Sequence, residues 1–181
     1  MSWSRRGILA ALAAAPLAGC GFHPLYGGHT AGEYDPRLAA IKVAPVVSER
    51  IGSGSMEHAG EGREDQLLEL ALREKLNPRG LTLSTRYTLN VTLIMSRSDL
   101  GIQRNATSTR SEINAQASYV LSGGGINVTG NSRTVGAFNL QDDAWAATVA
   151  ENNARQRAIE DLADAIYMQL SLWSQRQAAA R

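Results

Sequence analysis

Apolar and polar residues alternate through the stretch Tyr87-Thr88-Leu89-Asn90-Val91-Thr92-Leu93-Ile94-Met95-Ser96. A period of two residues is that of a β-strand with one buried face and one exposed face. Strands of this kind belong to antiparallel sheets whose apolar face is covered by another layer. The stretch therefore predicts a sheet at the centre of the fold.

Two further segments extend this sheet along the chain. Residues 113–121 repeat the alternation, and residues 126–138 follow it more weakly. The glycines at 123–125 predict a tight reversal between them, and Gly130 and Gly136 suggest bulges in the last strand. Three strands joined by short turns form an antiparallel meander.

The cover for the sheet comes from two segments with helical periodicity. Residues 63–76 carry leucines at helical spacing, and Asn77-Pro78 ends that helix because the residue before proline avoids the helical region. The second helix is expected from about Asp142 to Trp173, with acids at its start and small alanines that allow close approach to a sheet.

A short alternating run with a proline, residues 41–46, predicts one more strand near a sheet edge. The expected element order is then β-α-β-β-β-α. The predicted fold class is α+β, a two-layer sandwich in which a four-stranded sheet, the meander plus one N-terminal strand, has two helices on one face.

The N-terminus looks like a lipoprotein leader. Arg5-Arg6 precede an uncharged run, residues 7–18, that is too short to span a membrane. Leu17-Ala18-Gly19-Cys20 follows and resembles the lipobox of bacterial lipoproteins. That resemblance implies cleavage before Cys20, S-diacylglycerol and N-acyl modification of Cys20, and a stable lipid anchor. A plain signal peptide with a buried cysteine nearby is the alternative.

The resulting domain organisation has four parts. Residues 1–19 are expected to be the signal peptide, and residues 20–37, rich in glycine and proline, the lipidated N-terminus and tether. Residues 38–174 form a single domain, and residues 175–181 a disordered tail. Gly21 after the cysteine, by resemblance to lipoproteins of two-membrane bacteria, implies sorting to the outer membrane, with the domain on the periplasmic side.

Composition excludes several classes of protein. The 181 residues suit one domain, and a formal charge of +1 is far from the basic bias of a nucleic-acid binder. Removing Arg5 and Arg6 with the leader changes that charge to −1. One cysteine and three histidines, His23, His29 and His58, provide no disulfide framework, metal centre or catalytic constellation. We therefore expect no enzyme activity, no cofactor, no metal and no nucleic-acid partner.

Charge is unevenly distributed along the chain. Residues 81–135 hold five arginines against two acids, whereas residues 141–164 hold two arginines against six acids. Arg97, Arg104 and Arg110 gather around the turn between the first two long strands, and arginine suits phosphate and carboxylate groups. They are the candidate anion contacts. The alternative is that they keep a strand edge soluble.

The opening motif Leu17-Ala18-Gly19-Cys20-Gly21-Phe22-His23-Pro24-Leu25-Tyr26-Gly27 resembles the start of the LPS-assembly lipoprotein family, LptE. The order of predicted elements agrees, including the hairpin at residues 100–104 and the segment 144–146 before a long alanine-rich helix. The resemblance implies a non-enzymatic plug inside the outer-membrane barrel LptD that helps lipopolysaccharide reach the cell surface.

Some members of that family bind lipopolysaccharide through basic residues. No motif transfers those contacts to this sequence, so Arg97, Arg104 and Arg110 rest on charge placement alone. The expected partners are an LptD-like β-barrel, lipopolysaccharide, and the membrane through the lipid anchor. Two other functions stay open: a periplasmic lipoprotein accessory of an ABC-type lipid transport system, and a lipid-anchored enzyme, for which the sequence offers no good catalytic residue.

Overall fold

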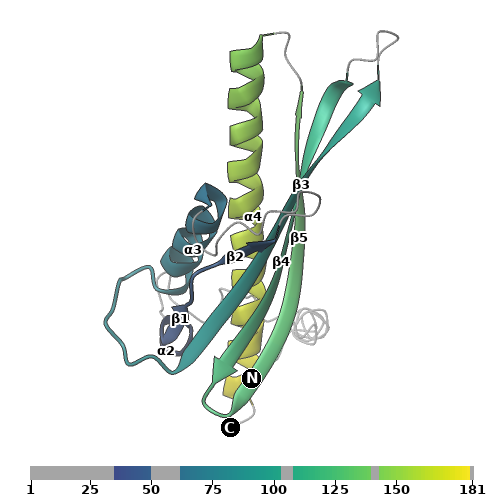
Figure 1. The fold of residues 1–181 in the computed structure, drawn as a ribbon. Helices are drawn as coiled ribbons and strands as arrows, with labels where there is room; N and C mark the ends of the chain where they lie inside the picture. The colour runs from purple at the N-terminus through teal and green to yellow at the C-terminus, as the bar shows by residue number, and fades with distance from the viewer. Residues whose placement is uncertain (1–34, 50–61, 103–107, 140–142, 180–181) are drawn as a thin grey trace, which may run out of the picture. The chain divides into compact units, whose positions relative to one another are not determined.

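The computed structural model describes residues 35–49, 62–102, 108–139 and 143–179. In this part of the chain one open five-stranded sheet has its helices on one face (Figure 1). The elements are α2 (Pro36–Ala39), β1 (Ile41–Val43), β2 (Val47–Glu49), α3 (Arg63–Leu76), β3 (Tyr87–Ile102), β4 (Ser108–Gly123), β5 (Ile126–Asn139) and α4 (Ala144–Ala179). The α+β class is confirmed.

The predicted meander is confirmed in β3, β4 and β5. β4 pairs antiparallel with both of its neighbours, so that Leu121 lies opposite Leu89 on one side and Val128 on the other. The three glycines of the β4–β5 turn all have positive φ angles, of 126°, 56° and 80°, which a side chain would make costly. The register of β5 against β4 continues without interruption past Gly130 and Gly136, so the predicted bulges are wrong.

The N-terminal strand differs from the prediction in number. Two short strands, β1 and β2, take the place of one, and both pair parallel with β3. Pro45, between them, has no N–H to donate to the ladder. Three residues, 44–46, connect β1 to β2, whereas only two residues of β3 lie between Leu89 and Thr92, the partners of the strand ends. In the described part of the chain the sheet therefore has five strands instead of four.

The main core lies between the sheet and the helix layer. Leu68, Leu72 and Leu76 of α3 are buried, as the helical spacing predicted. They pack in one cluster with the inward residues of the sheet and of α4, among them Leu89, Leu93, Leu121, Leu162, Ile166 and Leu170. A smaller cluster of Ile113, Phe138 and Ala154 continues this core toward the start of α4.

The helix α4 is longer than predicted. It begins at Ala144 and continues past Trp173 to Ala179. Asp143, directly before it, accepts hydrogen bonds from the Trp145 and Ala146 amides at 2.7 and 3.1 Å. Residues 175–179 are therefore helical, and a disordered tail over them is wrong. Trp173 packs edge-on against Tyr87, with ring centroids 5.3 Å apart.

A polar contact joins α2 to the far end of α4. The Ser174 hydroxyl donates to the Asp35 carboxylate, and the Arg37 guanidinium donates to the Ser174 carbonyl at 2.9 Å. Asp35 also caps α2 by accepting from the Arg37 amide. Residues 36 and 37, expected at the end of the tether, are thus part of the folded domain. These contacts tie α4 to α2 at Ser174, just beyond the predicted end of the helix.

Several predictions fall outside the described residues. The leader, Cys20, the tether up to residue 34 and Arg104 are among them. Within the described part, no helix combines the length and apolar character needed to cross a membrane.

Candidate interaction surfaces

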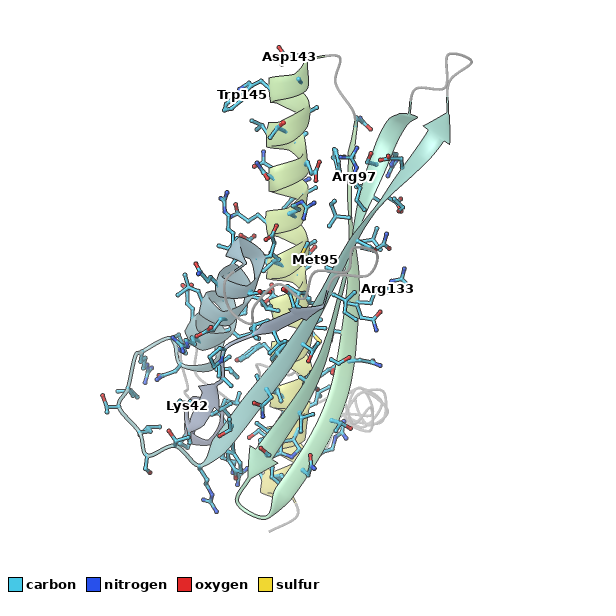
Figure 2. All side chains as sticks on the ribbon, in the orientation of Figure 1. Lys42, Met95, Arg97, Arg133, Asp143 and Trp145 are labelled. Carbon is cyan, nitrogen blue, oxygen red and sulfur yellow. The ribbon has the colours of Figure 1, made fainter. Side chains whose placement is uncertain are left out.

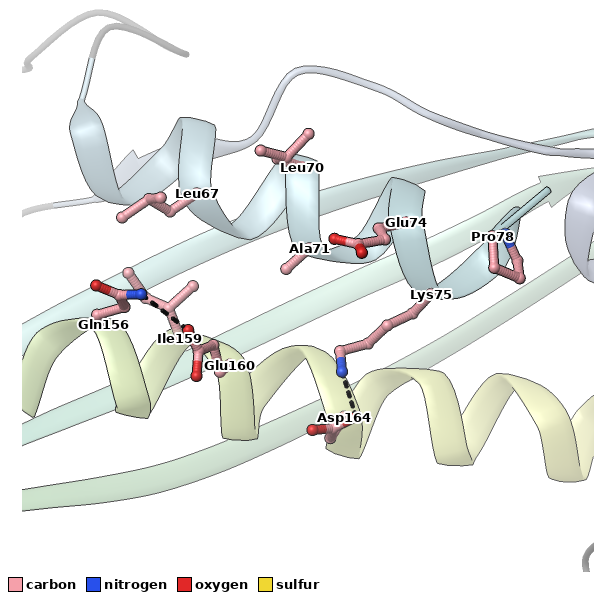
Figure 3. A pocket seen from close by; sticks show the side chains of 10 residues that line it. All are labelled: Leu67, Leu70, Ala71, Glu74, Lys75, Pro78, Gln156, Ile159, Glu160 and Asp164. Carbon is pink, nitrogen blue, oxygen red and sulfur yellow. Dashed lines mark hydrogen bonds and ion pairs between the residues drawn. The ribbon is translucent and has the colours of Figure 1, made fainter. Parts of the chain in front are cut away.

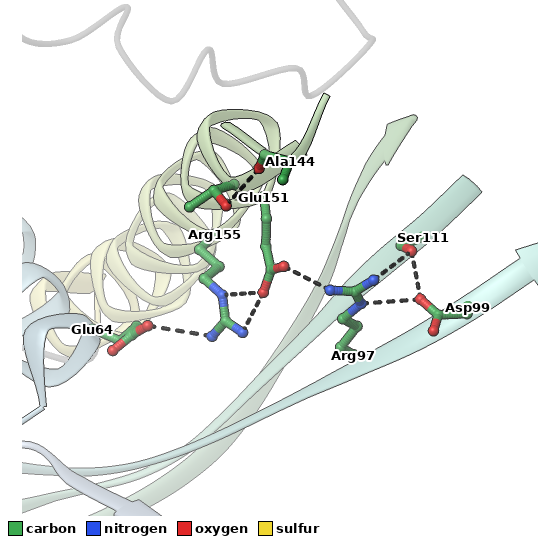
Figure 4. A network of polar contacts seen from close by, with 8 residues as sticks. Glu64, Arg97, Asp99, Ser111, Ala144, Glu151 and Arg155 are labelled. Atoms are coloured by element: carbon green, nitrogen blue, oxygen red, sulfur yellow. Dashed lines mark hydrogen bonds and ion pairs between the residues drawn. The ribbon is translucent and has the colours of Figure 1, made fainter. Parts of the chain in front are cut away.

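Arg97 lies on the helix side of β3 and is held by acids. Its Nη1 donates to Glu151 Oε2 on α4 at 2.7 Å, and its Nε donates to Asp99 Oδ1 at 3.0 Å (Figure 4). The guanidinium also lies 5.5 Å from the centroid of the Phe138 ring, a distance at which cation–π attraction operates.

These contacts belong to a longer polar network. Arg155 donates to Glu151 at 2.7 Å and reaches Glu64 on α3 at 3.3 Å. At the other end, the hydrogen bond from Ser111, followed by the contact with Arg97, lowers the pKa of Asp99 below its usual value. The charge of Arg97 is therefore paired with acids within the fold.

Arg110 lies on the opposite face of the sheet. In β4 the buried residues Ser111 and Ile113 face the helices, so Arg110, one residue before Ser111, faces away from them. It is exposed and stands in register with Leu100 and Asn139. The structure thus separates Arg97 and Arg110 by the sheet. Arg104 lies outside the described residues.

The face that carries Arg110 is polar and, in the described part of the chain, has no helix over it (Figure 1). Its residues are mostly serine, threonine, asparagine and glutamine. Successive cross-strand rows are Thr88, Ser122 and Asn127; Asn90, Val120 and Thr129; Thr92, Ser118 and Asn131; Ile94, Gln116 and Arg133; Ser96, Asn114 and Val135. We call this surface the polar sheet face.

Arg133 is a basic residue on this face that sequence analysis did not select. Figure 2 labels Arg133 beside the sheet. Its guanidinium donates to Asn114 Oδ1 at 2.9 Å, and Asn114 donates in turn to Ser98 at 3.2 Å. The alternation in residues 126–138 already placed Arg133 on the polar side of the sheet. It was not chosen as a candidate anion contact because it is far from the turn between the first two long strands. Its partner Gln116 is six positions from Arg110 along β4, a spacing of about 20 Å.

The chain matches the family model described as "LptE: Lipopolysaccharide-assembly" over residues 40–170. This match covers most of the sequence and all of β3, β4 and β5. The chain belongs to the LptE family. The resemblance in the opening motif thus led to the right family, although that motif precedes the matched residues. Membership of the LptE family places the chain in the general class of lipopolysaccharide-assembly lipoproteins.

Solved structures share the fold of this LptE-family chain at low identity. A lipoprotein of Caulobacter crescentus CB15 is 21% identical, with a TM-score of 0.51 and coverage of 76% of this chain and 92% of that one. Rare lipoprotein B of Shewanella oneidensis is 12% identical, with a TM-score of 0.51 and coverage of 75% and 98%. Lipoprotein B of Nitrosomonas europaea is 10% identical, with a TM-score of 0.50 and coverage of 79% and 92%. The comparison with curated proteins gave no match.

Proposed function

We propose that this chain is an outer-membrane lipoprotein that acts as plug and assembly subunit of the lipopolysaccharide translocon. In this role it binds an LptD-like β-barrel and lipopolysaccharide, and it is anchored on the periplasmic side through lipid on Cys20. Membership of the LptE family supports the general role. The polar sheet face is the observation that supports the specific role as a plug inside the barrel.

A plug needs a surface that is stable in water and compatible with a hydrophilic lumen. The interiors of outer-membrane barrels are polar and the strands that line them alternate between lumen and lipid. Hydroxyl and amide side chains both donate and accept hydrogen bonds, so they can pair with many lumen groups. Ser118, with its neighbours Thr92 and Asn131, lies at the centre of such a surface.

The structure changes the set of residues that we propose as lipopolysaccharide contacts. Arg110 stays a candidate because it is exposed on the polar sheet face, and Arg133 joins it on the same face. Arg104 stays a candidate from charge placement alone. Arg97 is withdrawn because its guanidinium is held by Glu151 and Asp99.

The direct test is a pull-down of the lipidated chain from gently solubilised outer membranes, followed by mass spectrometry. We expect a large β-barrel protein to copurify. A chain recovered alone, or with inner-membrane components of an ABC system, would overturn the proposal and support the alternative. The same preparation tests the anchor, because intact mass shows whether Cys20 is the acylated first residue.

A surface variant tests the role of the polar sheet face. Ser118→Trp places a bulky side chain at its centre and should strongly reduce recovery of the barrel. Asn153→Trp, at an exposed position of α4, is the matched control and should retain it. Circular dichroism of both variants verifies folding. Equal recovery with both variants would show that the sheet face does not contact the barrel.

A further inference from the structure

The helix layer carries a groove between α3 and α4 that the proposed plug role does not use. Its volume is about 530 Å³. Leu67 and Ala71 of α3 and Ile159 of α4 supply its apolar lining, and Pro78 lies at one end (Figure 3). This volume is enough for one or two large side chains of another molecule.

Leu70 is an exposed apolar residue at this groove. It lines the groove and yet is 63% exposed. Leu68 and Leu72 on the same helix are fully buried in the core, so Leu70 is not needed for packing. An exposed leucine beside an apolar groove provides a contact area for an apolar side chain from outside.

The rim of the groove has an excess of negative charge. Glu74, Glu160 and Asp164 line it against a single cation, Lys75. Lys75 is already paired with Asp164 at 2.6 Å, and Gln156 donates to Glu160 at 3.0 Å (Figure 3). An occupant with positive charge on either side of its apolar side chain would complement this rim.

We propose that the groove docks a segment of a partner protein in which an apolar side chain is flanked by lysines or arginines. The apolar side chain would lie against Leu70, Ala71 and Ile159, and the flanking cations would face Glu74 and Glu160. The chain's own residues 20–34 do not fit this description because they contain no lysine or arginine. Charge complementarity therefore selects a partner over this segment.

This surface is independent of the polar sheet face. The groove lies on the helix layer, and the polar sheet face lies on the other side of the sheet (Figure 1). Barrel binding through one surface can fail while docking at the other persists, and the reverse also holds. The two proposals are therefore distinguishable by experiment.

The first test is site-specific photo-crosslinking in native cell envelopes. The full lipidated chain carries a benzophenone amino acid at Leu70, and a matched control carries it at Leu172, which is 38% exposed on α4 and outside the groove. We expect Leu70 alone to capture a peptide with an apolar residue between basic ones. The charge reversal E160K/D164K should lower that yield about fivefold or more.

The second test uses defined peptides and the purified chain. One probe is an amphipathic helix with leucines on one face flanked by lysines, and the other has glutamates in place of the lysines. Fluorescence anisotropy should show binding of the lysine probe only, weakened at least about fivefold by Leu70→Glu. Because Leu70 and Glu160 are exposed, these variants should fold, which thermal unfolding verifies.

Defined results overturn the proposal. They are equal binding of both probes, no crosslink at Leu70, and capture of a second copy, of residues 20–34 or of an acidic segment. Loss of the barrel from the pull-down with the Leu70 crosslink intact would reject the plug role only.

Discussion

Gly136 on β5 lies against the backbone carbonyl of Ala154 on α4, so closely that a Cβ on residue 136 would come within 2.7 Å of that oxygen. Ala154 is itself fully buried. The pair thus lets the helix backbone approach the strand, and this contact sets the height of the first half of α4 above the sheet. The small alanines predicted to permit such an approach do so here.

Gly136→Ala should therefore destabilise the domain. The added methyl group cannot displace a helix carbonyl without moving α4, and overpacking of this kind costs about 1–3 kcal/mol. Urea unfolding measures the loss. Val135→Ala is the matched control because Val135 is 47% exposed on the polar sheet face and its change should cost less. An equal loss in both variants would contradict the close approach.

Arg97→Ala should lower stability and leave lipopolysaccharide binding unchanged. The variant removes the contacts with Glu151 and Asp99, and the contribution of such ion pairs to stability is small and decreases in high salt. Arg110→Ala should weaken lipopolysaccharide binding, because Arg110 is exposed on the polar sheet face. Unfolding and lipopolysaccharide-binding assays on both variants check this, and weaker binding by Arg97→Ala alone would contradict it.

Tyr119 should make the domain sensitive to alkaline pH. Burial raises the pKa of its phenol above the usual 10.0, and the hydroxyl donates to Gln169 Oε1 at 2.7 Å. A folded-state pKa above the unfolded one stabilises the fold fully below pH 10, and the contribution disappears as the pH rises through the folded pKa.

Unfolding experiments at pH 8 and pH 11 check this expectation. The original chain should lose more stability between them than Tyr119→Phe, which has no phenol to ionise. The variant should also be less stable at pH 8, because it leaves Gln169 without that donor. An identical loss in both chains would mean that other groups account for the alkaline transition.

Cys20→Ala should keep the protein out of the outer membrane. Without the thiol no diacylglycerol can be attached, and the leader has no lipobox cysteine for cleavage. Fractionation should place the variant outside the outer membrane, and intact mass should show no acyl chains. Retention in the outer membrane at the original level would show that the barrel or another partner, and not the anchor, fixes the location.

Local patterns predicted much of this fold. The bounds of α3 agree with the leucine spacing and Pro78, and the alternation from Tyr87 identified β3. The N-terminal strands were less accessible, because β1 and β2 have three residues each, too few for a reliable period. Their parallel partner β3 lies beyond α3, and pairing over such a distance has no local signal.

The candidate site shows the same limit. Alternation in β3 places Arg97 on the side of Leu89 and Leu93, which was visible in the sequence. That Glu151 would meet it there depends on the position of α4 above the sheet, which no local pattern gives. The alternation in β5 indicated that Arg133 lies on the polar face. It was not chosen because the candidates were the arginines close to the turn between β3 and β4.

The contact of α2 with Ser174 has a mechanical consequence. With the proposed anchor at Cys20, a pull on the lipid would reach the Asp35–Ser174 and Arg37–Ser174 contacts before the short strand β1. These contacts would pass part of such a force to α4, a helix of 36 residues, before the three-residue pairing of β1 with β3 is loaded.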